Sequence, residues 1–270
     1  MSIIDIRNLS YAYSNGTKAL DNITLQISNS ESVAIIGQNG AGKTTLVKLI
    51  KGLMKPLNGD VIVDLFNTKN YTTAQMAKFV GYVFQNPDDQ IFHNDVYSEI
   101  TFGPRKIKMK EKDISENVKW AAELCNLENY LKENPFDLPL SIRKFVTIAS
   151  VISMRPKIII LDEPTAGQDK IGIETLSKII KILSDKGHTI ITISHDMEFV
   201  AENFKRTIVM ANKKIVADNK TNEIFWNEGV LAEAMLKPPH VLKLVKECGI
   251  HNKNLLRFEE IIDYFCEKIK

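Results

Sequence analysis

The sequence lacks the features that mark membrane-spanning and secreted chains. Among its 270 residues, no window approaches 18 uninterrupted apolar residues, the length that a membrane-spanning helix requires. Residues 1–7 lack the long apolar stretch of a signal peptide. The three cysteines, Cys125, Cys248 and Cys266, are spaced too widely for a C-x-x-C metal site and do not form the pattern of a disulfide framework. These absences predict a cytosolic protein that does not itself cross a membrane.

The sequence also lacks a large excess of positive or negative charge. The formal net charge is +2, which is too small to indicate a nucleic-acid partner, and there is no sustained basic stripe. The nearest approach is the lysine-rich segment 105–112, which we interpret as a solvated loop or helix face. The composition, 44% apolar and 25% charged, is ordinary for a globular protein, and there are no repeats or low-complexity segments. The sequence therefore predicts one large domain, or a domain with an appendage.

The most informative stretch is residues 37–45, which read G-Q-N-G-A-G-K-T-T and match the phosphate-binding pattern G-x-x-x-x-G-K-T. A predicted strand at 32–36 precedes it and a predicted helix at 46–51 follows it, as this motif requires. Its glycines let the backbone N–H groups and the helix N-terminus point at phosphate oxygens. Lys43 is expected to reach the β- and γ-phosphates and Thr44 to ligate Mg²⁺. The predicted phosphate-binding residues are Gly37, Asn39, Gly40, Ala41, Gly42, Lys43, Thr44 and Thr45.

Short strands surround this motif in the N-terminal part of the chain. From residue 3 to 27, apolar runs alternate with turn residues at 14–16 and 21–22, which predicts a small antiparallel sheet. A strand at 60–63 is expected to join that sheet. A buried strand follows at 80–85.

Helices and parallel strands are predicted for most of the remaining chain. Residues 88–150 are helical in pattern, with a 3.6-residue period at 114–124 and 142–152. Beyond them we expect strands at 157–161, 189–193, 207–210 and 214–217, and a helix at 173–186. This strand–helix–strand order implies parallel strands covered by helices on both faces. From residue 227 the chain reads as helices broken at Pro238 and Pro239, too short for an independent domain.

These patterns predict an α/β fold: a P-loop NTPase core with an antiparallel β subdomain, a helical subdomain and a short helical C-terminal appendage. The expected core domain covers residues 1–225, with the helical subdomain inserted at about 88–150. The appendage covers residues 226–270.

Polar residues follow several of the predicted parallel strands. In such a sheet the ligand lies outside the carboxyl ends of the strands, where Asp162, Glu163 and His195 should meet the phosphate-binding loop, with Gln85 as a fourth group. Adjacent side chains at a strand end point to opposite sides, so we expect Asp162 to hold Mg²⁺ and Glu163 to orient or deprotonate the attacking water. His195 is expected to contact the γ-phosphate. The alternatives are a solvated turn or a helix cap for the acidic pair and an ordinary loop residue for His195.

Together these residues resemble the ATPase subunit of ATP-binding cassette (ABC) transporters over about residues 1–225. The resemblance rests on Tyr13, the loop 37–45, Gln85, the runs 162–164 and 166–169, and His195, in this order. It implies that Tyr13 stacks on the adenine of ATP, that Gln85 ligates Mg²⁺ and senses a membrane partner, that residues 166–169 form the D-loop and that His195 is the switch histidine. Alternatively, Tyr13 only packs on neighbours such as Tyr11.

A narrower resemblance is to the ATPases of energy-coupling factor (ECF) importers, which take up vitamins or transition-metal ions. It rests on segments 83–92 and 99–104 and on Pro238 and Pro239. It implies a peripheral position on the cytoplasmic face of the cell membrane, an integral-membrane transport subunit and a substrate-binding membrane subunit that selects the solute. If the helical insertion carries the docking surface, Ile91 and Phe92 are its expected apolar anchors.

One segment departs from the family. Where ABC ATPases carry the signature L-S-G-G-Q, a gapless reading gives L-P-L-S-I at residues 138–142. Pro139 has neither a hydroxyl nor an N–H group, and Leu140 adds a bulky side chain where the family has glycine. With compensating gaps, Ser141 serves as the signature serine and helix cap, although the glycines are still absent. The degraded signature predicts a second, non-identical ATPase subunit as partner.

The function that these residues predict is ATP binding and hydrolysis, with Mg²⁺, in an ECF-type ABC importer. One alternative is a non-transport ABC protein acting on nucleic acid or ribosomes, which usually carries two cassettes or a long insertion. Another is a subunit that holds ATP as a clamp with little hydrolysis, which the degraded signature favours and which Glu163 and His195 oppose.

Overall fold

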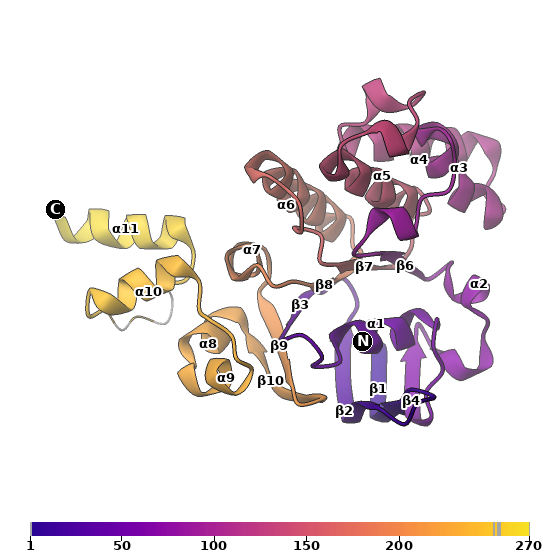
Figure 1. Cartoon of the computed structure of the whole chain (residues 1–270). Helices are drawn as coiled ribbons and strands as arrows, with labels where there is room; N and C mark the ends of the chain where they lie inside the picture. The colour runs from indigo at the N-terminus through magenta and orange to yellow at the C-terminus, as the bar shows by residue number, and fades with distance from the viewer. Residues whose placement is uncertain (1, 251, 253–254, 270) are drawn as a thin grey trace.

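In the computed structural model, residues 2–250, 252 and 255–269 are described, and they form two β-sheets with helices around them (Figure 1). The larger sheet of this described part has six strands in the order β10-β9-β3-β8-β7-β6, and all of them are parallel except β10. Its strands are β3 (Ser32–Ile36), β6 (Val80–Val83), β7 (Ile158–Asp162), β8 (Thr189–Ile193), β9 (Arg206–Ala211) and β10 (Lys214–Lys220). These strands confirm the predicted parallel α/β core.

The smaller sheet is antiparallel, as predicted, with the order β2-β1-β4-β5. Its strands are β1 (Ser2–Ala12), β2 (Lys18–Ser28), β4 (Asn58–Val63) and β5 (Phe66–Asn67). The predicted turn at 14–16 joins β1 to β2, but the turn predicted at 21–22 is wrong. These residues stay in β2 as a bulge, in which Asn22 takes a φ of 52° and its N–H donates to Ser10 Oγ at 2.9 Å.

Both faces of the parallel sheet are buried. Along β7, Ile158 and Ile160 belong to the apolar cluster shared with the small sheet and with α1 (Lys43–Lys51). Ile159 and Leu161 belong to the cluster shared with helices on the other face. These helices are α5 (Leu140–Ile152), α6 (Lys170–Asp185) and α7 (Met197–Asn203). The continuous apolar run of this strand thus reflects burial on two sides.

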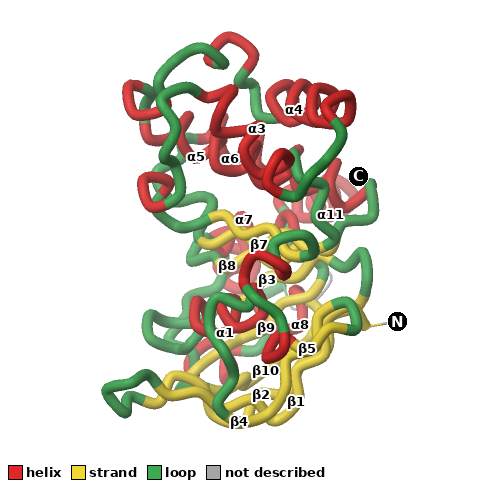
Figure 2. The backbone as a smooth tube through the Cα atoms, turned by 90° about the vertical axis from the view of Figure 1, so that its right-hand side faces the viewer, coloured by secondary structure: helices red, strands yellow, loops and turns green. Residues whose placement is uncertain are grey.

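The helical subdomain lies between β6 and β7 in sequence and at the end of the molecule opposite the small sheet (Figures 1 and 2). With α5 it contains α3 (Val96–Lys106), α4 (Glu111–Leu124) and the 3₁₀ turns η2 (Pro87–Asp89), η3 (Glu128–Tyr130) and η4 (Pro135–Asp137). The lysine-rich segment 105–112 joins α3 to α4, and its charged residues are exposed, as predicted. Two short elements, η1 (Thr68–Asn70) and α2 (Thr73–Met76), connect the small sheet to β6.

The C-terminal part is helical, and its helices extend to one side in Figure 1. They are α8 (Thr221–Trp226), α9 (Glu228–Glu233), α10 (His240–Glu247) and α11 (Phe258–Ile269), with the predicted break between α9 and α10 at Pro238 and Pro239. Leu231, Ala234, Leu242 and Leu256 join the main apolar cluster, whereas Val245, Leu255 and Ile261 form a small cluster of their own. The division at residue 225 stays a prediction.

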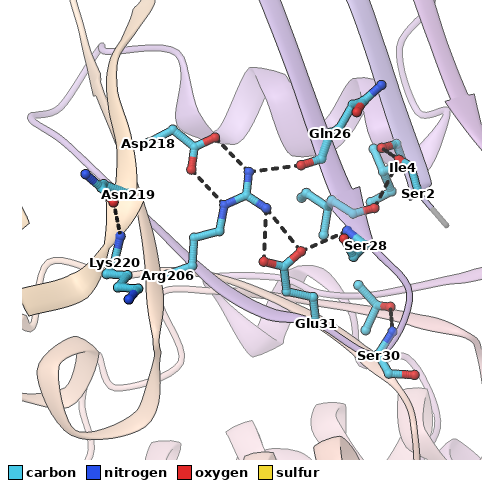
Figure 3. Close-up of polar contacts among 12 residues, drawn as sticks. Ser2, Ile4, Gln26, Ser28, Ser30, Glu31, Arg206, Asp218, Asn219 and Lys220 are labelled. Atoms are coloured by element: carbon cyan, nitrogen blue, oxygen red, sulfur yellow. Dashed lines mark hydrogen bonds and ion pairs between the residues drawn. The ribbon is translucent and has the colours of Figure 1, made fainter.

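Arg206 links the two sheets through three neighbouring segments (Figure 3). Its guanidinium donates to both Asp218 oxygens at 2.7 Å, to Glu31 at 3.0 and 3.1 Å, and to the Gln26 carbonyl at 3.0 Å. These hydrogen bonds raise the pKa of Arg206, so it stays charged. The side chain is 26% exposed, which makes this ion-pair network more protected than an ordinary surface pair.

We expect Arg206→Met to lower the free energy of unfolding by about 1–3 kcal/mol, because it removes the guanidinium donors from two carboxylates and a carbonyl. The midpoint of urea unfolding measures this loss. Arg7→Met is the matched control, since Arg7 pairs with Asp5 at a side-chain exposure of 61% and should leave the midpoint unchanged. Equal midpoints for the two variants would show that the Arg206 network adds no stability.

Candidate nucleotide-binding site

The carboxyl ends of four parallel strands meet at one pocket of about 400 Å³. Eleven of the predicted site residues line it: Tyr13, Asn39, Gly40, Gly42, Lys43, Thr44, Thr45, Gln85, Asp162, Glu163 and His195. Gly37 and Ala41 are buried in the loop and do not line the pocket. Thr17, Lys18, Ala19 and Lys213 also line it and were not predicted. The strand ends thus bring together residues that are far apart in the sequence.

The phosphate-binding loop has a backbone that only glycine fits at two positions. Gly37 has a φ of 149°, and a Cβ atom there would lie 2.1 Å from the Met210 carbonyl oxygen. Gly42 has a φ of 103° and forms the N-cap of α1, and a Cβ atom there would lie 2.6 Å from the Ala19 carbonyl oxygen. The helix begins at Lys43, three residues earlier than predicted, and no side chain caps it. Its first N–H groups are therefore free to bind an anion.

Lys43 extends along this loop toward the pocket. Its Nζ donates to the carbonyl oxygens of Gly37 at 2.7 Å and Gln38 at 3.1 Å, and lies 3.4 Å from His195 Nε2. Burial lowers the pKa of Lys43, and the nearby Glu163 and Asp162 carboxyls oppose this shift. A cation that is held by neutral carbonyls beside an open pocket is available to bind phosphate oxygens.

Asp162 has one bonded and one free carboxylate oxygen. Oδ2 accepts a hydrogen bond of 2.6 Å from the Tyr82 hydroxyl on the neighbouring strand. Burial and the Asp162 charge raise the pKa of Tyr82, which therefore stays neutral and donates. Oδ1 is buried and has no hydrogen-bond partner among the described residues. With the Thr44 hydroxyl and the Gln85 amide in the same pocket, this oxygen fits the oxygen ligands that Mg²⁺ prefers.

The Tyr82 contact was missed by the sequence analysis, which placed this residue only in a buried strand. The sequence feature that could have revealed this contact is a tyrosine hydroxyl in an otherwise apolar run, because a buried hydroxyl needs a hydrogen-bond partner. That partner depends on which strand pairs with β6, which the sequence does not state.

Glu163 begins the loop after β7 in a left-handed conformation, with a φ of 49°. Its Oε2 accepts from the His195 N–H at 3.0 Å, and its Oε1 lies 3.2 Å from His195 Nε2. Burial raises the pKa of Glu163 to about 7, while burial and Lys43 lower the pKa of His195. The expectation that Asp162 and Glu163 point to opposite sides is wrong. Both line one pocket, because the backbone leaves strand geometry at Glu163.

Tyr13 packs on its neighbours and also lines the pocket. Its ring packs edge-on against Tyr11 with centroids 5.5 Å apart, and its hydroxyl lies 2.8 Å from Thr45 Oγ1. The side chain is nevertheless 41% exposed and lines the pocket. Stacking on adenine stays a prediction.

The segment in the signature position begins α5. Pro139 is the N-cap residue, no side chain caps the helix, and Leu140 is 49% exposed. Ser141 is already the second helical residue, so the alternative in which it caps the helix is wrong. Its carbonyl oxygen accepts a hydrogen bond of 3.0 Å from Gln168 Nε2 in the predicted D-loop.

The glycine-rich loop at a helix N-terminus, the buried lysine and the carboxylates at the end of β7 define a nucleoside-triphosphatase of the P-loop class. The family model described as ABC transporter matches residues 20–166. The energy-coupling factor transporter ATP-binding protein EcfA2 of Clostridium perfringens is 40% identical, over 96% of this chain and 93% of that protein. The chain therefore belongs to the ABC transporter ATP-binding family, and it is an ATPase.

Other similar proteins agree with this family. A putative ABC transporter ATP-binding protein of Caldanaerobacter subterraneus is 43% identical over 96% of this chain, which spans 45% of that protein's length. The solved structure of cbiO1 from Clostridium perfringens, described as part of the ABC transporter complex cbiONQ, is 32% identical with a TM-score of 0.77. That alignment covers 91% of this chain and 99% of the other. Within the described part of the chain, no helix has both the length and the apolar character needed to cross a bilayer.

Proposed function

We propose that this chain is the ATP-binding and hydrolysing subunit of an ECF-type importer for a vitamin or metal ion. In this proposal it sits on the cytoplasmic face of the cell membrane and contacts an integral-membrane transport subunit and a substrate-binding membrane subunit. Its similarity to EcfA2 and to cbiO1 supports this proposal. The observation that carries it is that one short segment lines two sites: Gln85 lines the nucleotide pocket, and Gln90 and Phe92 line a neighbouring apolar groove.

In this proposal the pocket residues have different roles in ATP hydrolysis. Lys43 and the N–H groups of α1 neutralise and orient the phosphates, and Glu163 accepts a proton from the attacking water. His195, held by Glu163, contacts the γ-phosphate. Thr44, Gln85 and Asp162 would hold Mg²⁺, which when bound neutralises charge on the phosphate oxygens. These roles follow the usual pattern of phosphoryl transfer, in which positioning and charge stabilisation dominate.

The groove offers a docking surface for an apolar segment of the membrane partner. It has a volume of about 430 Å³, and its apolar lining includes Leu53, Phe84, Phe92, Phe102, Val151 and Met154. Phe92 is 57% exposed, as an interface anchor should be. Ile91 is only 4% exposed and belongs to the core of the helical subdomain, so its predicted role as a second anchor is wrong.

We expect Phe92→Ala to weaken retention of the membrane partner roughly 30-fold, which corresponds to about 2 kcal/mol for an aromatic anchor. The measurement is the amount of membrane protein that co-purifies with the tagged chain in mild detergent. Leu65→Ala is the control, because Leu65 is 78% exposed in the turn between β4 and β5 and does not line the groove. Equal retention by both variants would place the docking surface elsewhere.

The degraded signature supports a heterodimer with a second, non-identical ATPase subunit. In such a dimer each ATP lies between the phosphate-binding loop of one subunit and the signature of the other. The pocket built on Lys43 and Glu163 would then receive an intact signature from the partner. The partner's own ATP would face Pro139 and Leu140.

Co-purification of the tagged chain from its native membrane tests the proposed function. A small integral-membrane protein together with a second ATPase supports the importer. RNA or ribosomes would instead support the non-transport alternative. A complex that binds ATP without turning it over would support the clamp alternative.

A further inference from the structure

Lys144 is a buried cation that the roles described above do not use. It lies on α5, and only 2% of its surface is exposed. Its Nζ donates to the backbone carbonyl oxygens of Glu163 at 2.7 Å and of Ala166 at 3.3 Å. Both acceptors are neutral, so these contacts compensate the burial of an ammonium group less than a carboxylate partner would. A packed apolar side chain would fill this place at a lower cost to stability.

The carbonyl that Lys144 binds belongs to a residue in a strained conformation. Glu163 has a φ of 49°, a strained left-handed conformation that a residue other than glycine keeps only where the surrounding structure fixes it. Here the backbone is held on both sides: its N–H donates to the Ile193 carbonyl at 2.9 Å, and its carbonyl accepts from Lys144. This strained backbone directs the Glu163 carboxylate into the pocket beside His195.

The same helix holds the rest of this loop. Gln168 Nε2 donates to the Ser141 carbonyl, and a Cβ atom on Gly167 would lie 3.5 Å from Leu140 Cδ2. The first turns of α5 therefore contact the loop 163–168 at three places. Lys144 binds two loop carbonyls, Ser141 accepts from Gln168, and Leu140 lies beside Gly167. A displacement of α5 would be transmitted to the backbone of Glu163.

The electrostatic environment agrees with this geometry. Burial lowers the pKa of Lys144, and the Glu163 and Asp162 carboxyls oppose that shift. Burial raises the pKa of Glu163, while the His195 N–H, Lys43 and Lys144 lower it and Asp162 raises it further. The electrostatic attraction between Lys144 and Glu163 thus acts alongside the hydrogen bond to the Glu163 backbone.

We propose that Lys144 is a positioning residue for ATP hydrolysis: it binds the Glu163 carbonyl and so holds the Glu163 carboxylate where it can act on the attacking water. This inference rests on the proposed role of Glu163. It adds a residue that follows the signature position and does not line the nucleotide pocket.

Lys144→Met in the purified complex tests the inference. We expect kcat to fall about 100-fold, because a displacement of about 1 Å of a catalytic group has an effect of this size, and KM for ATP to stay within about threefold. The split between kcat and KM separates a positioning role from a general loss of structure, which would impair ATP binding as well.

Lys55→Met is the matched control, because Lys55 also donates to two backbone carbonyls, those of Thr68 and Tyr71, away from the pocket. It should leave both kcat and KM unchanged. If Lys144→Met does not fold, Lys144→Gln, which keeps one donor group, serves in the same comparison. Folded Lys144 variants with a wild-type kcat, or with a kcat loss matched by an equal rise in KM, would overturn the inference.

Failure of the proposed function is distinguishable from failure of this inference. A wild-type complex without ATPase activity would contradict the proposed function itself. Normal turnover by Glu163→Gln would remove the role of Glu163 and with it that of Lys144. An active wild-type complex, an inactive Glu163→Gln and an unaffected Lys144→Met would reject the Lys144 inference alone.

Discussion

Lys43→Ala should abolish tight ATP binding, whereas Glu163→Gln should leave ATP bound and stop its hydrolysis. Lys43 carries a full positive charge into the pocket, where it neutralises phosphate in the bound ground state, so its loss should weaken ATP binding roughly 100-fold or more. Glu163 acts on the water and not on the nucleotide, so the amide should lower kcat about 100- to 10,000-fold with little effect on affinity.

Equilibrium binding of ATP and steady-state turnover, measured on the same preparations, separate the two effects. Lys48→Ala is a suitable control, since Lys48 belongs to the same helix as Lys43 but does not line the pocket. Equal loss of nucleotide binding in Lys43→Ala and Glu163→Gln would show that Glu163 is structural.

The isolated chain should show little ATPase activity, and adding its non-identical ATPase partner should restore it. A homodimer would place Pro139 and Leu140 over both nucleotides. Loss of even one preorganised donor to the developing charge costs about 100- to 1000-fold in rate, and here the serine hydroxyl and close approach to the amides are both lost. In a heterodimer this defect is confined to one site, so the other can hydrolyse ATP.

Two variants of the heterodimer sharpen this prediction. Glu163→Gln should remove most of the turnover, because it disables the site that receives the intact signature. Converting residues 139–142 to S-G-G-Q should change turnover less, because it repairs the site that mainly holds ATP. Fast, cooperative hydrolysis by the isolated wild-type chain would contradict the heterodimer, and it would show that residues 138–142 form a working signature despite their sequence.

Local sequence was sufficient to predict the elements and most of the pocket. The phosphate-binding loop is a contiguous motif, and the strand-end rule placed Gln85, Asp162 and His195 beside it without knowledge of the strand order. The errors occurred where one sequence pattern allows two conformations. Asn22 supports a turn or a bulge equally well, because both use a residue with positive φ.

Contacts across the sheet and between subdomains were beyond the sequence analysis. Tyr82 finds Asp162 only because β6 pairs with β7. Lys144 shares a helix face with the buried Ile148 and Val151, and a charge on an apolar face was a signal that the helix prediction for 142–152 did not use. Its partner, the Glu163 carbonyl, depends on how the helical subdomain sits on the core, which is a tertiary property.

The central position of β3 has a consequence for the order in which the protein acquires function. Val33 on β3 pairs with Ile191 on β8 and with Arg206 on β9. The strand that leads into the phosphate-binding loop is therefore synthesised long before the two strands that flank it. Met210, whose carbonyl lies against Gly37, is also made late. Such pairing between distant residues makes folding depend on contacts of high sequence separation, which form slowly. During synthesis, we therefore expect the chain to bind nucleotide only after the whole core has formed. A nascent chain that ends before β9 contains the complete phosphate-binding motif but lacks the strand that packs against its loop.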